Sequence, residues 1–264
     1  MDQALEIVGL VPAAGRADRL SPLPISKELF PIAFDTSVDP ELPHLRLVSH
    51  YLFEKLRLGD AQKTYLVIRE GKWDIPNYFL DGAGVGLNLA YIVTAQTPGV
   101  PFTVDRAYPF IKNDLVLFGY PDILFQSPDA FKQLVDRLRA VSADAVIGCF
   151  DLFPGQLTDR ASWHENGRIS VLDVRSTGPD GVPGWVIAVW TPVFTEYLHK
   201  YLANLASKNP VGKPLPEIFL GHIFQATLGE GLHVNRVYFS RQNFWDIGSP
   251  EGLQKALEDK ERWI

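Results

Sequence analysis

The sequence predicts an α/β fold with a mixed, mostly parallel central sheet and helices on both faces. Three observations point to it. Apolar runs of strand length alternate with amphipathic stretches of helix length along the whole chain. Several helical stretches open with a proline, which favours the first position of a helix. Turns rich in glycine, proline and aspartate separate the elements, and such alternation is typical of a parallel sheet covered by connecting helices.

The strands are predicted from short apolar runs that lie between turn residues. In chain order they span residues 5–11, 64–69, 88–94, 114–118, 144–150, 169–174, 185–190 and 233–239. The first of them runs directly into a loop of small residues.

The helices are predicted from apolar residues at helical spacing and from prolines at their starts. They span residues 47–58, 101–110, 128–141, 192–206, 215–228 and 250–262. In the first helix, Tyr51, Leu52 and Leu56 fall on one face and are predicted to pack in the core. The stretches 151–162 and 176–184 are interrupted by Gly, Pro and Asp and are predicted to be surface loops around an open cleft.

Length and composition favour one globular domain over residues 1–264. The chain is 46% hydrophobic, which is enough to bury one large core. Its formal charge of -6 provides no basic surface for a nucleic acid or an anionic membrane. The single cysteine, Cys149, lies in an apolar run and is predicted to be a buried hydrophobic residue, so no internal disulfide is expected.

A cytoplasmic protein is expected from the absence of targeting signals. The first residues lack the basic and apolar segments of a secretion signal. No stretch approaches the ~18 uninterrupted apolar residues of a membrane-spanning helix. Neither secretion nor membrane insertion is therefore predicted.

A phosphate-binding loop is predicted directly after the first strand. Small side chains allow the backbone N–H groups of Ala13, Ala14 and Gly15 to approach a ligand, and successive N–H groups form an anion-binding concavity. Arg19 and Lys27 follow and supply the positive charge that a triphosphate needs. A strand followed by such a turn also occurs in proteins without a ligand, and the loop alone leaves this alternative open.

The loop lacks the signatures of two large nucleotide-binding classes. Only Gly15 is present where the dinucleotide fingerprint G-x-G-x-x-G needs three glycines. No G-K-[ST] sequence follows the loop, so a P-loop is not supported either.

Two aspartates are predicted to bind a metal ion. Asp122 follows the strand 114–118, and Asp246 stands between the large apolar residues Trp245 and Ile247. A carboxylate in apolar surroundings is costly to bury unless it caps a helix, pairs or binds a cation. Two converging carboxylates suit Mg²⁺ beside substrate phosphates. The alternative is that Asp122 only makes a turn and that Asp246 or Ser249 caps the last helix.

Together these motifs resemble those of the sugar-1-phosphate nucleotidyltransferases, which include glucose-1-phosphate thymidylyltransferase and UTP:glucose-1-phosphate uridylyltransferase. The resemblance rests on the stretch from Ala13 to Pro22, on Lys27-Glu28-Leu29-Phe30-Pro31 and on the closing sequence from Trp245 to Glu251. It covers nearly the whole chain. It implies an enzyme with a Rossmann-like fold and a single nucleotidyltransferase domain, active in nucleotide sugar biosynthesis.

The resemblance also implies a reaction and residue roles. A sugar 1-phosphate would attack the α-phosphorus of a nucleoside triphosphate, with UTP or dTTP favoured, and release pyrophosphate. The catalytic residues would be Arg19, Lys27, Asp122 and Asp246, with Asp122 and Asp246 holding Mg²⁺. The nucleotide would contact Ala13, Ala14, Gly15, Arg19, Gln96 and Gly99.

The acceptor half is predicted less fully than the nucleotide half. Arg175 would hold the sugar phosphate, because a guanidinium binds phosphate bidentately. Val174 stands where these enzymes carry an acid, and Ala17 and Asp18 also depart from their loop pattern. Two alternatives therefore stay open: a non-catalytic protein that binds a nucleotide or sugar phosphate, and transfer to a non-sugar phosphate such as phosphocholine. The sequence leaves the sugar and the oligomeric state open.

Overall fold

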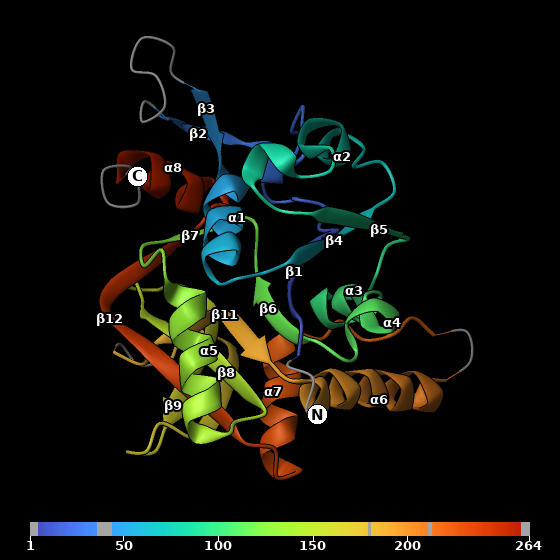
Figure 1. Ribbon diagram of the computed structural model, residues 1–264, viewed down its shortest axis with the longest axis vertical. Helices are drawn as coiled ribbons and strands as arrows, with labels where there is room; N and C mark the ends of the chain where they lie inside the picture. Colours follow the sequence, from blue (N-terminus) through green and yellow to red (C-terminus); the bar gives the residue numbers. More distant parts are fainter. Residues whose placement is uncertain (1–4, 36–43, 179–180, 211–212, 260–264) are drawn as a thin grey trace.

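The computed structural model describes residues 5–35, 44–178, 181–210 and 213–259. The predicted α/β fold with a mixed sheet is confirmed (Figure 1). A ten-stranded sheet has the strand order β5-β4-β1-β6-β11-β8-β12-β7, with β9 and β10 attached beside β11. No helix of this described part is both long and apolar enough to cross a membrane.

The first half of the chain builds the parallel part of the sheet. β1 (Ile7–Ala13) lies between β4 (Lys63–Arg69) and β6 (Leu115–Gly119), and β5 (Leu89–Thr94) lies outside β4. All of these pairs are parallel. The carboxyl ends of the four strands therefore meet at one edge of the sheet, where open α/β sheets bind ligands.

The second half adds antiparallel strands. β11 (Gly184–Trp190) runs antiparallel to both β6 and β8 (Ala145–Asp151). The long β12 (Val234–Asp246) pairs in parallel with β8 and, at its far end, antiparallel with β7 (Ile123–Phe125). This last pairing brings the end of β12 to the turn that follows β6.

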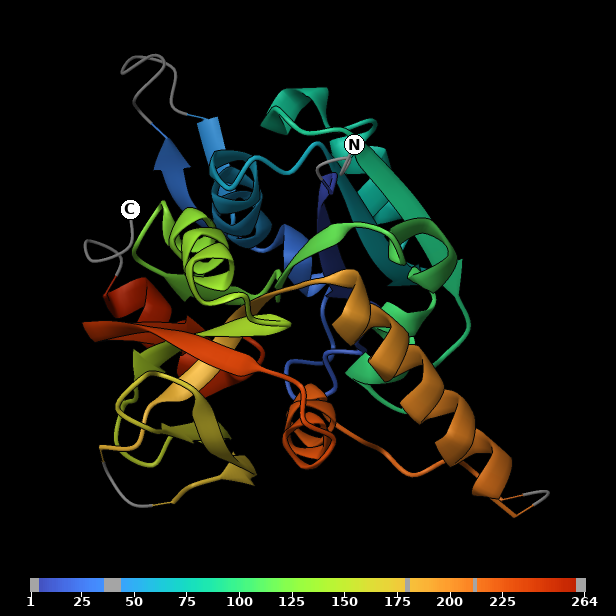
Figure 2. The same ribbon diagram turned by 60° about the horizontal axis from the view of Figure 1, so that its bottom comes forward.

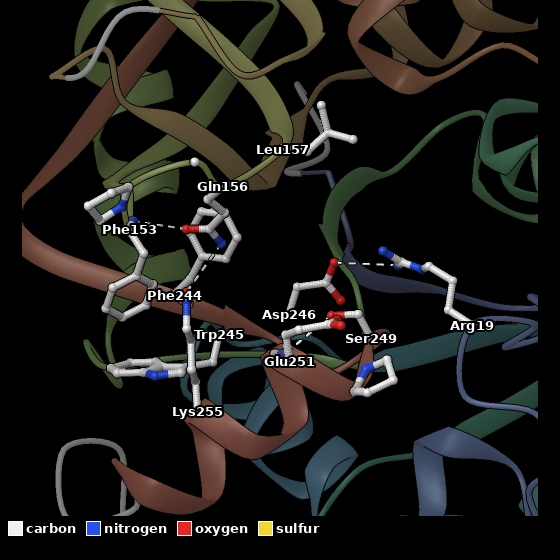
Figure 3. Close-up of a pocket in the computed structure, with 14 residues that line it drawn as sticks. Arg19, Phe153, Gln156, Leu157, Phe244, Trp245, Asp246, Ser249, Glu251 and Lys255 are labelled. Atoms are coloured by element: carbon white, nitrogen blue, oxygen red, sulfur yellow. Dashed lines mark hydrogen bonds and ion pairs between the residues drawn. The ribbon is translucent and has the colours of Figure 1, made fainter.

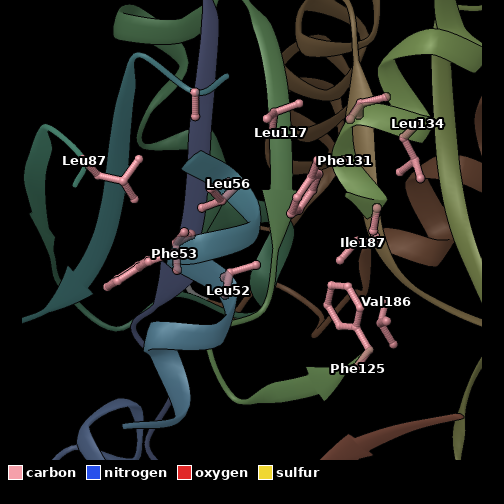
Figure 4. Close-up of a cluster of buried hydrophobic side chains, with 14 of the residues drawn as sticks. Leu52, Phe53, Leu56, Leu87, Leu117, Phe125, Phe131, Leu134, Val186 and Ile187 are labelled. Carbon is pink, nitrogen blue, oxygen red and sulfur yellow. The ribbon is translucent and has the colours of Figure 1, made fainter. Parts of the chain in front are cut away.

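Helices cover both faces because side chains alternate along the buried strands. On β1, Val11 and Ala13 pack on one face, whereas Val8 and Leu10 pack on the other. The first face is covered by α1 (Val48–Leu58), α2 (Asp74–Phe79) and α5 (Ala130–Val141). Figure 4 shows side chains of α1 and α5 on this face. The second face is covered by α3 (Val100–Asp105), α4 (Tyr108–Ile111), α6 (Pro192–Lys208) and α7 (Leu220–Gly229). Figure 2 shows α6 in gold and α7 in orange.

Two predicted helices have different bounds in the structure. The helix expected at 101–110 is split into α3 and α4, because Pro109 has no N–H to continue the α3 hydrogen-bond ladder. The helix expected from residue 215 begins only at Leu220, since Pro216 favours an extended Leu215. The last helix, α8 (Pro250–Glu258), starts as predicted, and residues 260–262 of the prediction lie outside the described residues.

The prediction that 151–162 is a loop is wrong over its second part. β9 (Thr158–Trp163) pairs with β10 (Ile169–Ser176) and with β11. The strand was missed because its sequence is polar and includes an arginine. Arg160 is only 2% exposed, and its guanidinium donates to the backbone carbonyls of Ser176 and Val182. These hydrogen bonds make a charged residue compatible with a buried strand position.

Several short elements were not predicted. They are the 3-10 helices η1 (Lys27–Leu29) and η2 (Ala83–Val85), the hairpin of β2 (Pro31–Asp35) and β3 (His44–Leu47), α2, β7 and β9. Apart from β9, whose polar sequence was discussed above, these elements are too short for hydrophobic periodicity to distinguish them from loops.

Candidate active site

A cleft of about 780 Å³ opens at the carboxyl edge of the parallel strands. Its wall includes the loops that follow β1, β5 and β6 and the end of β12. All the predicted site residues line it except Ala13, which is 1% exposed at the end of β1. Ala13 is thus buried beside the cleft, and its contact with the nucleotide through a backbone N–H group stays a prediction.

The predicted phosphate-binding loop lies against Lys27. Gly15 is exposed, and a β-carbon at this position would be 3.8 Å from Lys27 Nζ. Ala17 adopts a left-handed backbone conformation with φ of 58°, which favours glycine. Arg16 donates a hydrogen bond to Gln96 Oε1 and so joins this loop to the loop after β5.

The loop that carries Gln96 and Gly99 has a geometry that only glycine permits at its end. Gly99 has φ of 145°, and a β-carbon there would lie 2.3 Å from the carbonyl oxygen of Ile218. Thr103 Oγ1 donates to the Gly99 carbonyl at 3.2 Å and contacts Thr97 Oγ1 at 2.6 Å. Gln96 and Gly99, the residues predicted to contact the base, thus lie on a loop that is fixed by hydrogen bonds from Thr103 of α3.

The two predicted metal-binding aspartates converge. The pairing of β7 with β12 places Ile123 opposite Asp246, and Ile247 N donates to the Asp122 carbonyl at 3.0 Å. A β-carbon on Gly248 would lie 2.8 Å from Asp246 Oδ1, 3.0 Å from Arg19 Nη2 and 3.2 Å from Asp122 Oδ2. Three charged side chains therefore surround one point, and the glycine leaves room for them.

Capping does not account for Asp246. Ser249 is the N-cap of α8, because its Oγ accepts from Gly252 N at 3.1 Å. Asp246 Oδ1 instead accepts from Gly248 N at 2.8 Å, while its Oδ2 lies 3.7 Å from Arg19 Nη2 (Figure 3). The side chain of Arg19 is 64% exposed, so this ion pair is weak and leaves the guanidinium accessible.

Lys27 and Asp122 form a mostly buried ion pair. Burial alone would raise the pKa of Asp122, but the Lys27 ammonium and its hydrogen bond outweigh burial and lower this pKa. Burial likewise opposes charge on Lys27, yet Asp122, Glu28 and Asp246 together raise the Lys27 pKa. The pKa of Asp246 is raised, first by burial and then by the charge of Asp122. Two carboxylates in this position favour a cation between them.

A set of polar contacts that the sequence did not reveal holds Lys27 in place. Glu28 and Lys72 are 2% and 5% exposed, and Lys72 Nζ donates to both carboxylate oxygens of Glu28 at 2.8 and 2.7 Å. The neighbouring Ser26 donates its N–H and its hydroxyl to Asp74 at 2.6 and 2.8 Å. A signal was present, because Glu28 stands before the apolar Leu29 and Phe30 and a buried acid needs a partner.

Arg175 lines the part of the cleft that is formed by β9, β11 and the segment before α7. The guanidinium carbon of Arg175 is 4.8 Å from the centre of the Phe219 ring, and its backbone N–H donates to Asp159 Oδ1 at 2.9 Å. Burial raises the pKa of Asp159, which comes from the unpredicted strand β9. Tyr120 and Trp185 also line this part. An arginine stacked on an aromatic ring keeps its donors free for an anion.

The donor set fits magnesium rather than a metal that needs a protein cage. No group of three or more His, Cys, Asp or Glu side chains that could hold a metal is found in the described part of the chain. Mg²⁺ binds through one or two carboxylates together with water and substrate phosphates. Asp122 and Asp246 supply such a pair.

Comparison with known proteins identifies the class of the fold. No protein-family profile matches the chain, and no curated protein sequence matches it. In three dimensions the chain is similar to solved nucleotidyltransferases of the sugar-phosphate type, so the predicted resemblance is confirmed for the fold.

Three of these structures define the likeness. A protein from Bacillus anthracis, described as a glucose-1-phosphate thymidylyltransferase and solved with sucrose, is 18% identical with a TM-score of 0.77, over 98% of this chain and 96% of that one. A UDP-glucose pyrophosphorylase solved with UDP-glucose is 17% identical with a TM-score of 0.74, over 97% and 98%. A UTP-bound UGPase from Acinetobacter baumannii is 18% identical with a TM-score of 0.73, over 97% and 93%.

Proposed function

We propose that this protein transfers a nucleotidyl group from a nucleoside triphosphate to a sugar 1-phosphate, giving a nucleotide sugar and pyrophosphate. The observation that carries the proposal is the convergence of Lys27, Asp122, Asp246 and Arg19 in one cleft. Gln96 and Arg175 line the same cleft and suit a base and a phosphate. The similar folds of known nucleotidyltransferases support the assignment.

In the proposed reaction an oxygen of the sugar 1-phosphate attacks the α-phosphorus. The bond from this phosphorus to the bridging oxygen breaks, and pyrophosphate leaves with the bonding electrons. Positioning and neutralisation of charge therefore provide the catalysis. Lys27 would stabilise negative charge at the reacting phosphate, and the exposed guanidinium of Arg19 would hold the β- and γ-phosphates.

Asp122 and Asp246 would hold Mg²⁺. When bound, the ion would supply further positive charge to the phosphates. The Lys27–Asp122 ion pair places an ammonium group beside the same carboxylates. We therefore expect activity to depend on a divalent cation.

The substrates are proposed by chemistry. An amide at Gln96 offers donors and an acceptor to the edge of a base, and we favour UTP or dTTP. Because the reaction uses nucleoside triphosphates, we place it in the cytoplasm. We leave the sugar open, since Arg175 accounts only for its phosphate.

The test is a substrate screen. Each of the common nucleoside triphosphates is combined with a panel of sugar 1-phosphates and with phosphocholine, with Mg²⁺ or with EDTA, and pyrophosphate release is measured. We expect Mg²⁺-dependent release with UTP or dTTP and at least one sugar 1-phosphate. Binding without release for every pair would favour the non-catalytic alternative, and release only with phosphocholine would favour the non-sugar acceptor.

A further inference from the structure

A second cavity borders the phosphate-binding loop. It has a volume of about 450 Å³ and shares Arg16 and Lys27 with the main cleft. Its other lining residues are Ala17, residues of the segment 21–26, and residues from the end of β4 to the start of α2. The two cavities therefore lie next to each other at Lys27.

The charged lining of this cavity is almost entirely positive, and we call it the basic cavity. Arg16, Lys27, Arg69 and Lys72 line it, together with a single acid, Asp74. The carboxylate of Asp74 already accepts hydrogen bonds from Ser26 and from the N–H of Ile75. The Asp74 carboxylate is thus hydrogen-bonded to uncharged donors. The four cations therefore give the cavity a net positive charge.

Two of these four cations have no acidic partner in the described part of the chain. Lys27 pairs with Asp122, and Lys72 pairs with Glu28. Among the residues that the structure describes, neither Arg16 nor Arg69 forms an ion pair. Two uncompensated guanidinium groups beside one cavity favour an anion with several charged oxygens.

Arg69 has a further unmet requirement. Its Nε is buried and has no hydrogen-bond partner among the described residues, and its Nη1 donates only a long bond of 3.3 Å to the Glu70 carbonyl. Arg69 is the last residue of β4, and the preceding Ile68 pairs with Ala13 at the end of β1. Arg69 therefore lies at the edge of the sheet where the predicted phosphate-binding loop begins. Buried donors without a partner are rare in proteins.

We propose that the basic cavity binds pyrophosphate, with Arg69 as a contact that the motifs do not indicate. The inference rests on the proposed function, in which pyrophosphate is the leaving group. The β- and γ-phosphates would enter the cavity past Lys27, and the released pyrophosphate would occupy it before dissociating. Arg19 lines the main cleft but not the basic cavity, so Arg19 and Arg69 would contact the phosphates from different sides.

The first experiment measures pyrophosphate binding by calorimetry with Mg²⁺ and without any sugar phosphate. Arg69→Gln should weaken binding about tenfold or more, because hydrogen bonds to a charged group are lost. Arg139→Gln, on the exposed face of α5, is the matched control and should bind as the wild type does. Equal pyrophosphate affinity in wild type and Arg69→Gln would overturn the proposal.

A second variant keeps the test valid if Arg69→Gln destabilises the fold. Ile25 lines the basic cavity, is 39% exposed and makes no charge contact, so Ile25→Glu adds an acid without removing a contact of Arg69. We expect pyrophosphate binding to weaken about tenfold in this variant, from repulsion within a confined anion site. Unchanged binding in Ile25→Glu would contradict the proposal.

Kinetics separate the leaving group from an independent phosphorylated effector, which has the same chemistry. In the reverse reaction Arg69→Gln should raise the KM for pyrophosphate while leaving the KM for the nucleotide sugar unchanged, and Arg69→Lys should restore part of the loss. In calorimetry without a sugar phosphate, pyrophosphate and the nucleoside triphosphate should exclude each other from the protein. Simultaneous binding of both would overturn the proposal in favour of an effector site. Pyrophosphate binding without turnover in the wild type would instead refute the proposed function.

Discussion

Gly248 shows how one residue can decide the geometry of this site. Its hydrogen in place of a side chain leaves the space in which Asp122, Asp246 and Arg19 meet. Arg19 is exposed and Asp122 is buried, yet both lie close to this glycine. The site therefore depends on a position that carries no chemistry of its own.

The substitution Gly248→Ala should reduce turnover by roughly 100-fold, because a misplacement of about 1 Å can cost that much. The new β-carbon would lie 2.8 Å from Asp246 Oδ1 and displace that carboxylate. Pyrophosphate release and thermal unfolding are measured together. Gly229→Ala, which has open space around its β-carbon, is the control and should keep full turnover. Full turnover in Gly248→Ala would show that the carboxylates need not lie as the structure has them.

Ala17 lends itself to a stability test. Its left-handed backbone costs an L-residue about 1–2 kcal/mol, so Ala17→Gly should raise the free energy of unfolding by about 1 kcal/mol. Ala83→Gly, in the exposed η2, should lower it by about 0.5–1 kcal/mol. Urea unfolding of both variants gives the comparison. A loss of stability in Ala17→Gly would contradict the strained conformation of the loop.

At the scale of elements, the short helix η1 is held to α2 by polar contacts instead of by a large apolar surface. Lys72, just before α2, binds Glu28, and Asp74, the first residue of α2, binds Ser26, so these contacts lie on either side of Lys27. Ser49 of α1 adds a bond of 2.7 Å from its hydroxyl to the Glu28 carbonyl. The position of Lys27 is therefore set by residues outside the recognisable motif.

Breaking the Glu28–Lys72 pair from one side should destabilise the protein by about 3–5 kcal/mol, because a buried charge loses its partner. Glu28→Gln and Lys72→Met each test this, and the double variant should recover much of the loss. Burial raises the pKa of Glu28 and lowers that of Lys72, which reflects the cost of keeping both charges inside. Urea unfolding of the single and double variants measures the coupling. Additive losses would show that the two side chains act independently.

At the scale of the whole molecule, sequence patterns predicted the elements with long apolar runs and missed those held by polar contacts. The strands that became β1, β6, β8 and β11 are buried on both faces and were predictable. β9 was not, since its buried Arg160 is satisfied by carbonyls of other segments. Hydrogen bonds between distant segments leave no local pattern in a sequence.

The candidate site divides in the same way. Arg19, Lys27, Asp122 and Asp246 belong to sequence motifs and were predicted, and the structure brings them together. Asp159, Arg69 and Lys72 follow no motif, and their place beside the cleft depends on strand order. The parallel arrangement of β1 and β4 connects the two groups, because it brings the end of each strand to one edge.

The measurement that tests the account most directly compares turnover in Asp246→Asn and Lys27→Ala with the wild type. Pyrophosphate release is followed with the best substrate pair and Mg²⁺, and Lys132→Ala on the exposed face of α5 is the control. We expect both site variants to lose on the order of 100-fold or more in turnover, as is typical when one charge stabiliser is removed. The control should match the wild type. Near wild-type turnover in both Asp246→Asn and Lys27→Ala would contradict the proposed function.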